Sequence, residues 1–168
     1  VYTLTRALER GTVGGTIPGS LLLHAVLDIM SSDFTVALEH EGAQVLAAID
    51  LVRSAAASHQ EAPLHGAILS LTTTLQNWDR LAQPFQLSAM SRGHDHQPSR
   101  QMARDVRALA VTIHNDHSQT KAAKRISYLL RDVFAEVPQV LELVKEDLAT
   151  LDDLITQGEA AAAQQALA

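Results

Sequence analysis

The stretch 64–82, which reads LHGAILSLTTTLQNWDRLA, decides the fold class of this chain. Its apolar residues recur at alternating steps of four and three, at Leu64, Ile68, Leu71, Leu75, Trp78 and Ala82. Only an α-helix brings residues with this spacing onto one narrow stripe, and so narrow a stripe is best buried against another helix. The stretch 137–155, VPQVLELVKEDLATLDDLI, repeats the pattern at Val137, Leu141, Val144, Leu148, Leu151 and Ile155. The chain therefore predicts helices packed on helices.

The composition agrees with a helical core. Hydrophobic residues make up 46% of the 168 residues but aromatic residues only 4%, so Ala, Leu, Val and Ile must fill the interior. Helix packing tolerates such a core better than a β-sandwich does, and the length suits one domain. We predict an all-α fold, an antiparallel helical bundle or short superhelix of about six helices, with the two striped helices at its centre. We expect Trp78 and Tyr128 in the core or in a groove.

Composition and charge exclude several classes of protein. The chain has no cysteine, which excludes disulfides, thiolate zinc sites and cysteine nucleophiles and favours a cytoplasmic location. No apolar run approaches the roughly 20 residues that span a bilayer, so we expect no membrane span. The net charge of −6 argues against general affinity for nucleic acid or anionic lipid. Because the chain begins at Val1, we expect a piece of a larger, bacterial-type protein.

Glycine and alanine mark the ends of the helical region. We predict a first segment, residues 1–17, made of a short helix over 2–10 and a hinge rich in glycine. The helical domain follows over residues 18–158, and its last helix is predicted to end at about Gln157, before Gly158. The alanine-rich tail, residues 159–168, has little to bury, so we expect it to fray.

Polar residues and prolines predict the breaks within the helical domain. Ser31, Ser32 and Asp33 predict the end of a helix that starts at Pro18 and the cap of the next one. Pro84 predicts a kink or a break near residues 82–83. Alternatively, Asn77 caps a separate short helix over 78–91. Further along, Ser99 is predicted to cap a helix after the loop 92–98, and a second helix follows the turn 114–118. So short a turn predicts that these two helices lie antiparallel.

The hairpin from about Val106 to Phe134 resembles a single tetratricopeptide repeat. The residues that match the family pattern are Leu109, Ala110 and Ile113 on the first helix, and Ala122 and Ile126 on the second. Three positions depart from it: Val106 replaces the usual tryptophan, Leu129 a small residue, and Phe134 the closing proline. The resemblance implies that the two helices nest closely against each other. No second repeat follows, whereas a solenoid needs about three.

The same hairpin is locally basic. Its candidate binding residues are Arg100, Arg104 and Arg107 on one face of the first helix, and Lys121, Lys124 and Arg125 on its partner. The last helix is acidic, so one interpretation is that these charges are solvated or pair with it, each pair contributing little. The other is that the arginine stripe docks an acidic peptide, a phosphate or RNA. RNA is the weaker version because few aromatic residues are available to stack on bases.

Histidine spacing suggests a metal site, while catalytic motifs are missing. The candidate ligands are His94 and His96 in the loop before this hairpin, and His114 and His117 at its turn. The longer zinc signatures are absent, so we predict no metal and no cofactor. There is no G-x-S-x-G elbow and no phosphate-binding G-x-x-x-x-G-K-[ST] loop. We therefore do not expect an enzyme.

These observations predict a non-enzymatic helical module for protein–protein interaction or oligomerisation, with a protein partner or a second copy as its ligand. The first alternative is a helical sensor domain that binds a small molecule or a metal. The second is a basic hairpin that binds an acidic peptide or RNA.

Overall fold

The structure, a computed structural model, describes residues 19–135 and 137–166. The helices are α2 (Gly19–Ala57), α3 (Glu61–Ser91), α4 (Gln97–Asn115), α5 (Thr120–Val133) and α6 (Pro138–Ala166). The described residues contain no strand, which confirms the all-α class. Among these helices none is both long and apolar enough to cross a membrane. The predicted helix over 2–10 and the glycine-rich hinge lie outside the described residues.

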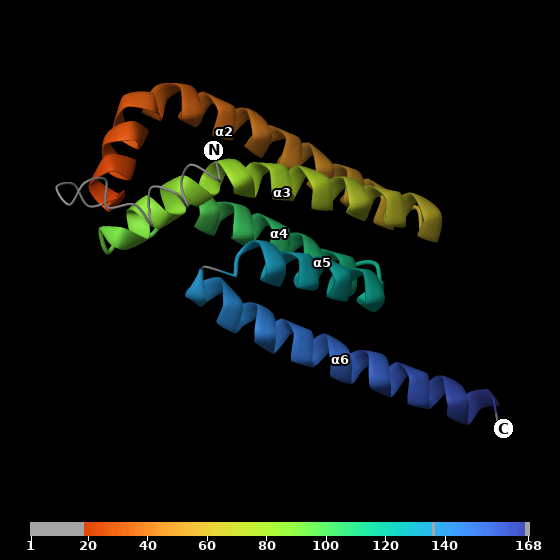
Figure 1. The fold of residues 1–168 in the computed structure, drawn as a ribbon. Coiled ribbons are helices and arrows are strands. Elements are labelled where there is room, and N and C mark those ends of the chain that lie inside the picture. Colours follow the sequence, from red (N-terminus) through yellow and green to blue (C-terminus); the bar gives the residue numbers. More distant parts are fainter. Residues whose placement is uncertain (1–18, 136, 167–168) are drawn as a thin grey trace.

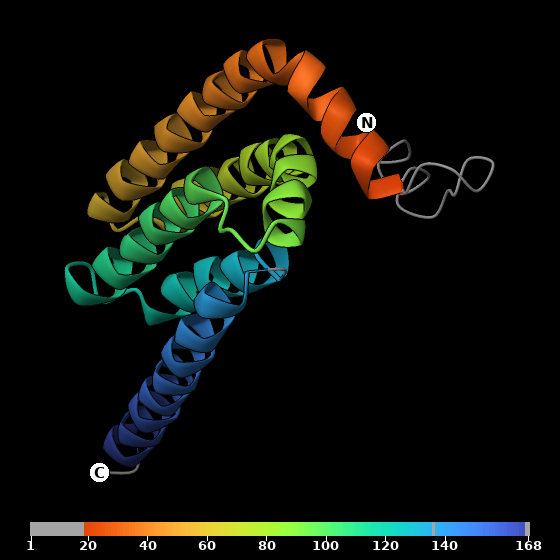
Figure 2. The same cartoon turned by 90° about the vertical axis from the view of Figure 1, so that its left-hand side faces the viewer.

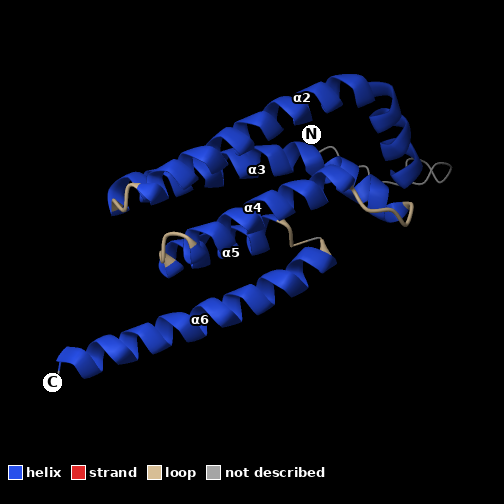
Figure 3. Cartoon of the chain, turned by 180° about the vertical axis from the view of Figure 1, so that it is seen from behind, coloured by secondary structure: helices blue, strands red, loops and turns tan. Residues whose placement is uncertain are grey.

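Successive helices alternate in direction (Figure 1). Extensive packing joins α2 to α3, α4 to α5, and α5 to α6, and smaller contacts join helices two apart in the chain. The α4–α5 hairpin is antiparallel, as its short turn predicts (Figure 1). Seen from behind, α6 forms one edge of the array and α2 the opposite edge (Figure 3). The last turns of α6 extend beyond α5, so one side of them has no neighbouring helix (Figures 1 and 2).

The two apolar stripes lie in different environments. All six stripe residues of α3 are buried, as the spacing predicts. Of the six residues in the second stripe only Val144, Leu148 and Leu151 are buried. Leu141 and Ile155 of α6, and Val137 just before it, are partly exposed. The prediction that both striped helices are central is therefore wrong for α6, because it packs mainly on α5.

The break predicted at residues 31–33 is also wrong, since α2 is one helix of 39 residues. Ser and Asp favour caps, but inside a helix they cost far less than proline does, so they do not force a helix to end. Figure 2 shows instead that α2 is bent, so that its first part leads away from the line of the rest.

Pro84 does not break α3, which continues to Ser91, and no separate helix starts near Trp78. The buried residues around the proline are Ala82, Pro84, Gln86 and Ser88. Burial at every second position cannot come from one helix face, whose period is 3.6, so this segment is covered on two sides. One cover is Phe34 of α2, whose ring lies edge-on to Phe85 with 5.8 Å between centroids. The other is the start of α4, which we describe below.

Two helix ends differ from the prediction. Helix α4 begins at Gln97 with His96 at its N-cap, so Ser99 lies inside the first turn and is not the cap. Pro98 suits that first turn, because a backbone N–H at this position would have no acceptor within the helix and its absence costs nothing. Helix α6 continues through Gly158 to Ala166. The alanines that follow Gly158 are the strongest helix formers, so the helix resumes after a single unfavourable residue.

Candidate functional site

Three of the predicted binding cations pair with acidic residues of α6. The guanidinium of Arg107 donates from Nε and Nη2 to the two carboxylate oxygens of Asp147, at 2.6 and 2.9 Å. Lys124 pairs with Asp152, and the Lys121 ammonium lies 3.3 Å from a carboxylate oxygen of Glu159. The basic hairpin and the acidic last helix thus neutralise each other along the α4–α6 and α5–α6 contacts.

These ion pairs also stabilise the charged forms of the cations. Hydrogen bonding to Asp147 raises the pKa of Arg107, and hydrogen bonding to Asp152 raises the pKa of Lys124. Both groups are therefore fully charged at neutral pH. Their charges form the ion pairs that join the α4–α5 hairpin to α6.

The other two arginines of the predicted stripe make local contacts. Arg100 donates to Asp95 in the preceding loop at 2.6 Å, and Arg104 donates to Gln101 one turn earlier at 2.8 Å. Arg100, Arg104 and Arg107 therefore have separate partners, and the structure does not bring them together with Lys121 and Arg125 at one cavity.

The four candidate histidines do not gather around a common point. Nδ1 of His96 contacts Ser99 Oγ at 2.7 Å, and Nδ1 of His114 contacts Thr120 Oγ1 at 3.1 Å. The ring of His117 lies edge-on to His59, with centroids 6.1 Å apart. Throughout the described ranges, no group of three or more His, Asp or Glu side chains could hold a metal ion. His94 and His96 share the loop between α3 and α4, whereas the other two lie at the α4–α5 turn.

A buried polar chain joins the end of α3 to the start of α4. Gln86 donates from Nε2 to Ser99 Oγ at 2.7 Å, and both side chains are buried. Ser99 can then donate its hydroxyl hydrogen to Nδ1 of a neutral His96. The imidazole also stacks on the Phe85 ring, with 6.1 Å between centroids. Burial lowers the pKa of His96 below its ordinary 6.5.

This lowered pKa predicts a pH dependence of stability. Between the folded pKa of His96 and its ordinary value the unfolded chain binds more protons, so the free energy of unfolding falls as the pH drops through 6.5. In His96→Gln, an amide can still accept from Ser99 but does not titrate. We expect its melting temperature to fall less than that of the wild type between neutral and mildly acidic pH. Equal slopes for both proteins, measured by thermal unfolding in matched buffers, would contradict this.

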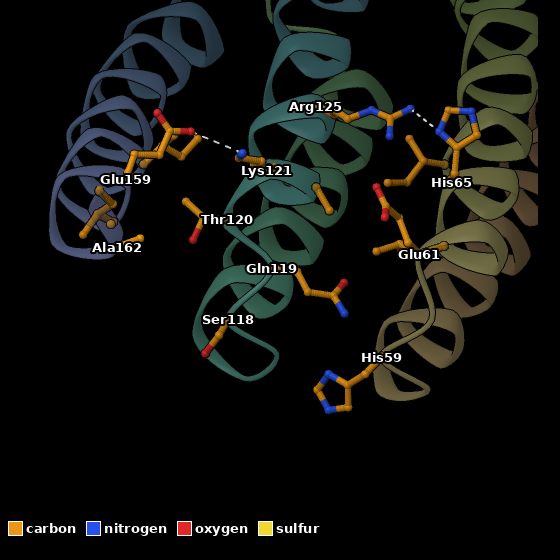
Figure 4. A pocket seen from close by; sticks show the side chains of 16 residues that line it. His59, Glu61, His65, Ser118, Gln119, Thr120, Lys121, Arg125, Glu159 and Ala162 are labelled. Atoms are coloured by element: carbon orange, nitrogen blue, oxygen red, sulfur yellow. Dashed lines mark hydrogen bonds and ion pairs between the residues drawn. The ribbon is translucent and has the colours of Figure 1, made fainter. Parts of the chain in front are cut away.

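A groove with a volume of about 550 Å³ opens between three helices that are far apart in the chain. One wall is the start of α3, the opposite wall is the end of α6, and the start of α5 lies between them (Figure 4). Its apolar residues include the buried Leu64 and Ile68 of α3, the partly buried Ile155, and the exposed Leu154 and Ala162 of α6. Most lining residues are exposed, so the groove is open to solvent.

Polar contacts tie both walls of the groove to α5. On one side Lys121 pairs with Glu159 of α6, and on the other Nη2 of Arg125 lies 2.7 Å from Nδ1 of His65 on α3 (Figure 4). Lys121 and Arg125 are one helical turn apart, so they project from the same side of α5. They are the two predicted binding residues that the structure brings together at one cavity.

Two turns close one end of the groove. His59 after α2 and Ser118 before α5 both have left-handed backbone, with φ of 54° and 56°. Such residues persist only where surrounding contacts hold them. One such contact is Gln119, which donates from Nε2 to the carbonyl oxygen of Ala56 at 3.2 Å and so joins the α4–α5 turn to the end of α2.

Comparisons with known proteins give no match: no protein-family model matches the sequence, and no curated protein or solved structure is significantly similar to it. The groove itself therefore carries the functional argument.

Proposed function

We propose that this domain is a non-enzymatic protein-interaction module, and that the groove of α3, α5 and α6 binds a segment of a partner protein. The observation that carries the proposal is the groove's mixed lining. Leu154 and Ile155 offer apolar surface to solvent beside the cations Lys121 and Arg125. Large apolar side chains that gather in an exposed concavity, with charges at the rim, are typical of interaction sites.

The open shape of the groove favours a peptide segment over a small metabolite. Small-molecule sites usually enclose most of the ligand surface, and a volume of 550 Å³ lies within their range. Here, however, both end residues of the α6 wall, Leu154 and Ala162, are exposed, so a small ligand would keep a large part of its surface in water. A peptide segment can cover the rim as well as the floor.

The order in which the helices pack favours the architecture of a short superhelix and argues against that of a closed bundle. Each helix packs mainly on a chain neighbour and makes smaller contacts with a helix two positions away, as in arrays of helical hairpins. A short superhelix leaves its end helix partly unpartnered, as α6 is here. The resemblance of residues 106–134 to a tetratricopeptide repeat fits this arrangement and remains part of the proposal.

Peptide display tests the proposal with a matched pair of α6 variants. A library of random peptides is selected on the wild-type domain, and each binder is titrated against Leu154→Arg and Leu143→Arg. Leu154 is 37% exposed inside the groove, and Leu143 is 45% exposed on the same helix but outside it. We expect Leu154→Arg to weaken binding tenfold or more, a loss of about 1.4 kcal/mol, and Leu143→Arg to leave it unchanged.

Three results would overturn the proposal. One is that no peptide is enriched above background, and another is that enriched peptides bind Leu154→Arg as tightly as the wild type. The third is a concentration-dependent dimer in light scattering that Leu154→Arg dissociates, because the groove would then hold a second copy. Thermal unfolding of both variants near the wild-type temperature shows that the substitutions leave the fold intact.

A further inference from the structure

We propose, resting on the function proposed above, that the groove takes an amphipathic helix of the partner and that a carboxylate on this helix binds Arg125. The contacts of one cation and the length and shape of the two walls determine which kind of segment the groove can take.

Arg125 is held in the groove by a contact with an imidazole nitrogen and not with a carboxylate. Its Nη2 lies 2.7 Å from Nδ1 of His65, and both side chains are exposed. A guanidinium carries five N–H donors, so this contact leaves donors on Nε and Nη1, which make no hydrogen bond or ion pair with another described residue. The imidazole fixes the position of the guanidinium without neutralising its charge. A carboxylate can therefore bind there without displacing an internal acid.

All but one of the other predicted binding cations already have acidic partners. Arg107, Lys124 and Lys121 pair with acids of α6, and Arg100 pairs with Asp95. An incoming carboxylate would have to compete with those internal partners, whereas at Arg125 it adds a partner. The exception, Arg104, contacts the neutral Gln101 but lies outside the groove. Within the groove, charge complementarity therefore singles out Arg125 as the anchor for an acid.

Glu61 determines which end of the groove receives the acid. It lines the groove at the start of α3, one helical turn before His65, and is exposed. A second carboxylate beside Glu61 would be repelled, whereas one placed at the Arg125 end faces a cation. The partner segment thus presents its acid toward Arg125 and a neutral or basic residue toward Glu61.

The walls suit about two turns of helix. The lining of α6 runs from Leu154 to Ala162 and that of α3 from Glu61 to Ile68, which at 1.5 Å per residue makes each wall about 10–12 Å long. The space lies between two helices and over a third, so a helix laid into it can present apolar residues at i, i+4 and i+7 to all three. Ile68, Leu154 and Ile155 would contact that apolar side.

Charge reversal tests the inference. The same peptide library is selected on the wild type, on Arg125→Glu, and on Arg104→Glu as the matched control, since Arg104 is exposed on α4 outside the groove. Only peptides that lose tenfold or more in affinity on Leu154→Arg are counted as groove binders. On the wild type and on Arg104→Glu we expect Asp or Glu beside the apolar residues. On Arg125→Glu we expect Lys or Arg there instead.

In a second experiment, the acidic residue of one binder is replaced by lysine, so that the charge is reversed on the peptide as well as at Arg125. We expect the altered peptide to bind the wild type at least tenfold more weakly than its parent and to regain affinity on Arg125→Glu. A proline inserted at the centre of the parent peptide should abolish binding, because the bound segment is helical.

The outcomes separate this inference from the function on which it rests. If groove binders are found but keep their acids on Arg125→Glu, or carry no acid on the wild type, the role of Arg125 is wrong and the interaction function stands. If they tolerate the central proline, the helical occupant is wrong. If no groove binders are found at all, the proposed function itself is overturned.

Discussion

Replacing Trp78 with alanine is expected to lower the free energy of unfolding by about 3–5 kcal/mol, among the largest effects of any single core truncation in this domain. The indole is 2% exposed and lies where three elements meet. On α3 it is part of the buried stripe, and its ring centroid is 6.1 Å from that of Phe134 at the end of α5. A Cβ built on Gly42 of α2 would lie 3.5 Å from Nε1, so the α2 backbone also approaches closely.

Chemical denaturation followed by far-UV circular dichroism measures this loss, since the variant lacks the chain's one tryptophan. Leu69→Ala is the matched control, because Leu69 lies on the same helix but is half exposed, and its loss should stay near 0.5 kcal/mol. Trp78→Phe, which keeps an aromatic ring, should fall between the two. If Trp78→Ala costs no more than Leu69→Ala, Trp78 does not join these elements.

Periodicity predicts the helices of this chain better than it predicts where they end. The stripe of α3 is buried along its whole length because its spacing specifies one face and that face meets other helices. Ends depend on small differences in free energy that packing overrides. Phe34 and the start of α4 cover the segment around Pro84, and the helix continues there despite the missing N–H. The stripe on α6 predicts a helix but not its place at the edge of the array. The spacing of apolar residues shows which face of a helix is buried, but not how many other helices cover that face.

Only those parts of the candidate site whose residues lie close together in the sequence could be predicted. Lys121 and Arg125 are four residues apart, so helix geometry alone places them on one side of α5. His65 and Leu154 come from segments roughly 60 residues before and 30 residues after Arg125, and only the packing of α3 and α6 against α5 brings them together. Leu154 is an apolar residue outside the α6 stripe, but so is Leu143, which lies outside the groove, so this signal alone does not locate the site. The charges of the basic hairpin and the acidic last helix suggested pairing, but the sequence alone could not specify which cation of the groove contacts a neutral residue instead of an acid.

Replacing Leu148 and Leu151 together with aspartate is expected to detach α6 from α5. The two side chains are 8% and 7% exposed, and with Val144 they form the buried face of α6. Each carboxylate would be desolvated against apolar side chains, in addition to the loss of the leucine contacts, so we expect a cost of at least about 3–5 kcal/mol. The ion pairs of Arg107, Lys124 and Lys121 cannot compensate, because each is at least partly exposed to solvent and such pairs contribute little to stability.

Hydrogen exchange shows whether the loss is confined to α6. We expect residues 141–160 to lose protection in the double variant while α2 and α3 keep more of theirs, because α6 packs mainly on α5. Leu143→Asp, on the exposed side of α6, should leave protection unchanged. Because Leu148 and Leu151 are covered within the chain, their replacement should not dissociate an oligomer as its primary effect. If the double variant stayed fully folded and only changed its mass in solution, these leucines would lie at an interface between copies.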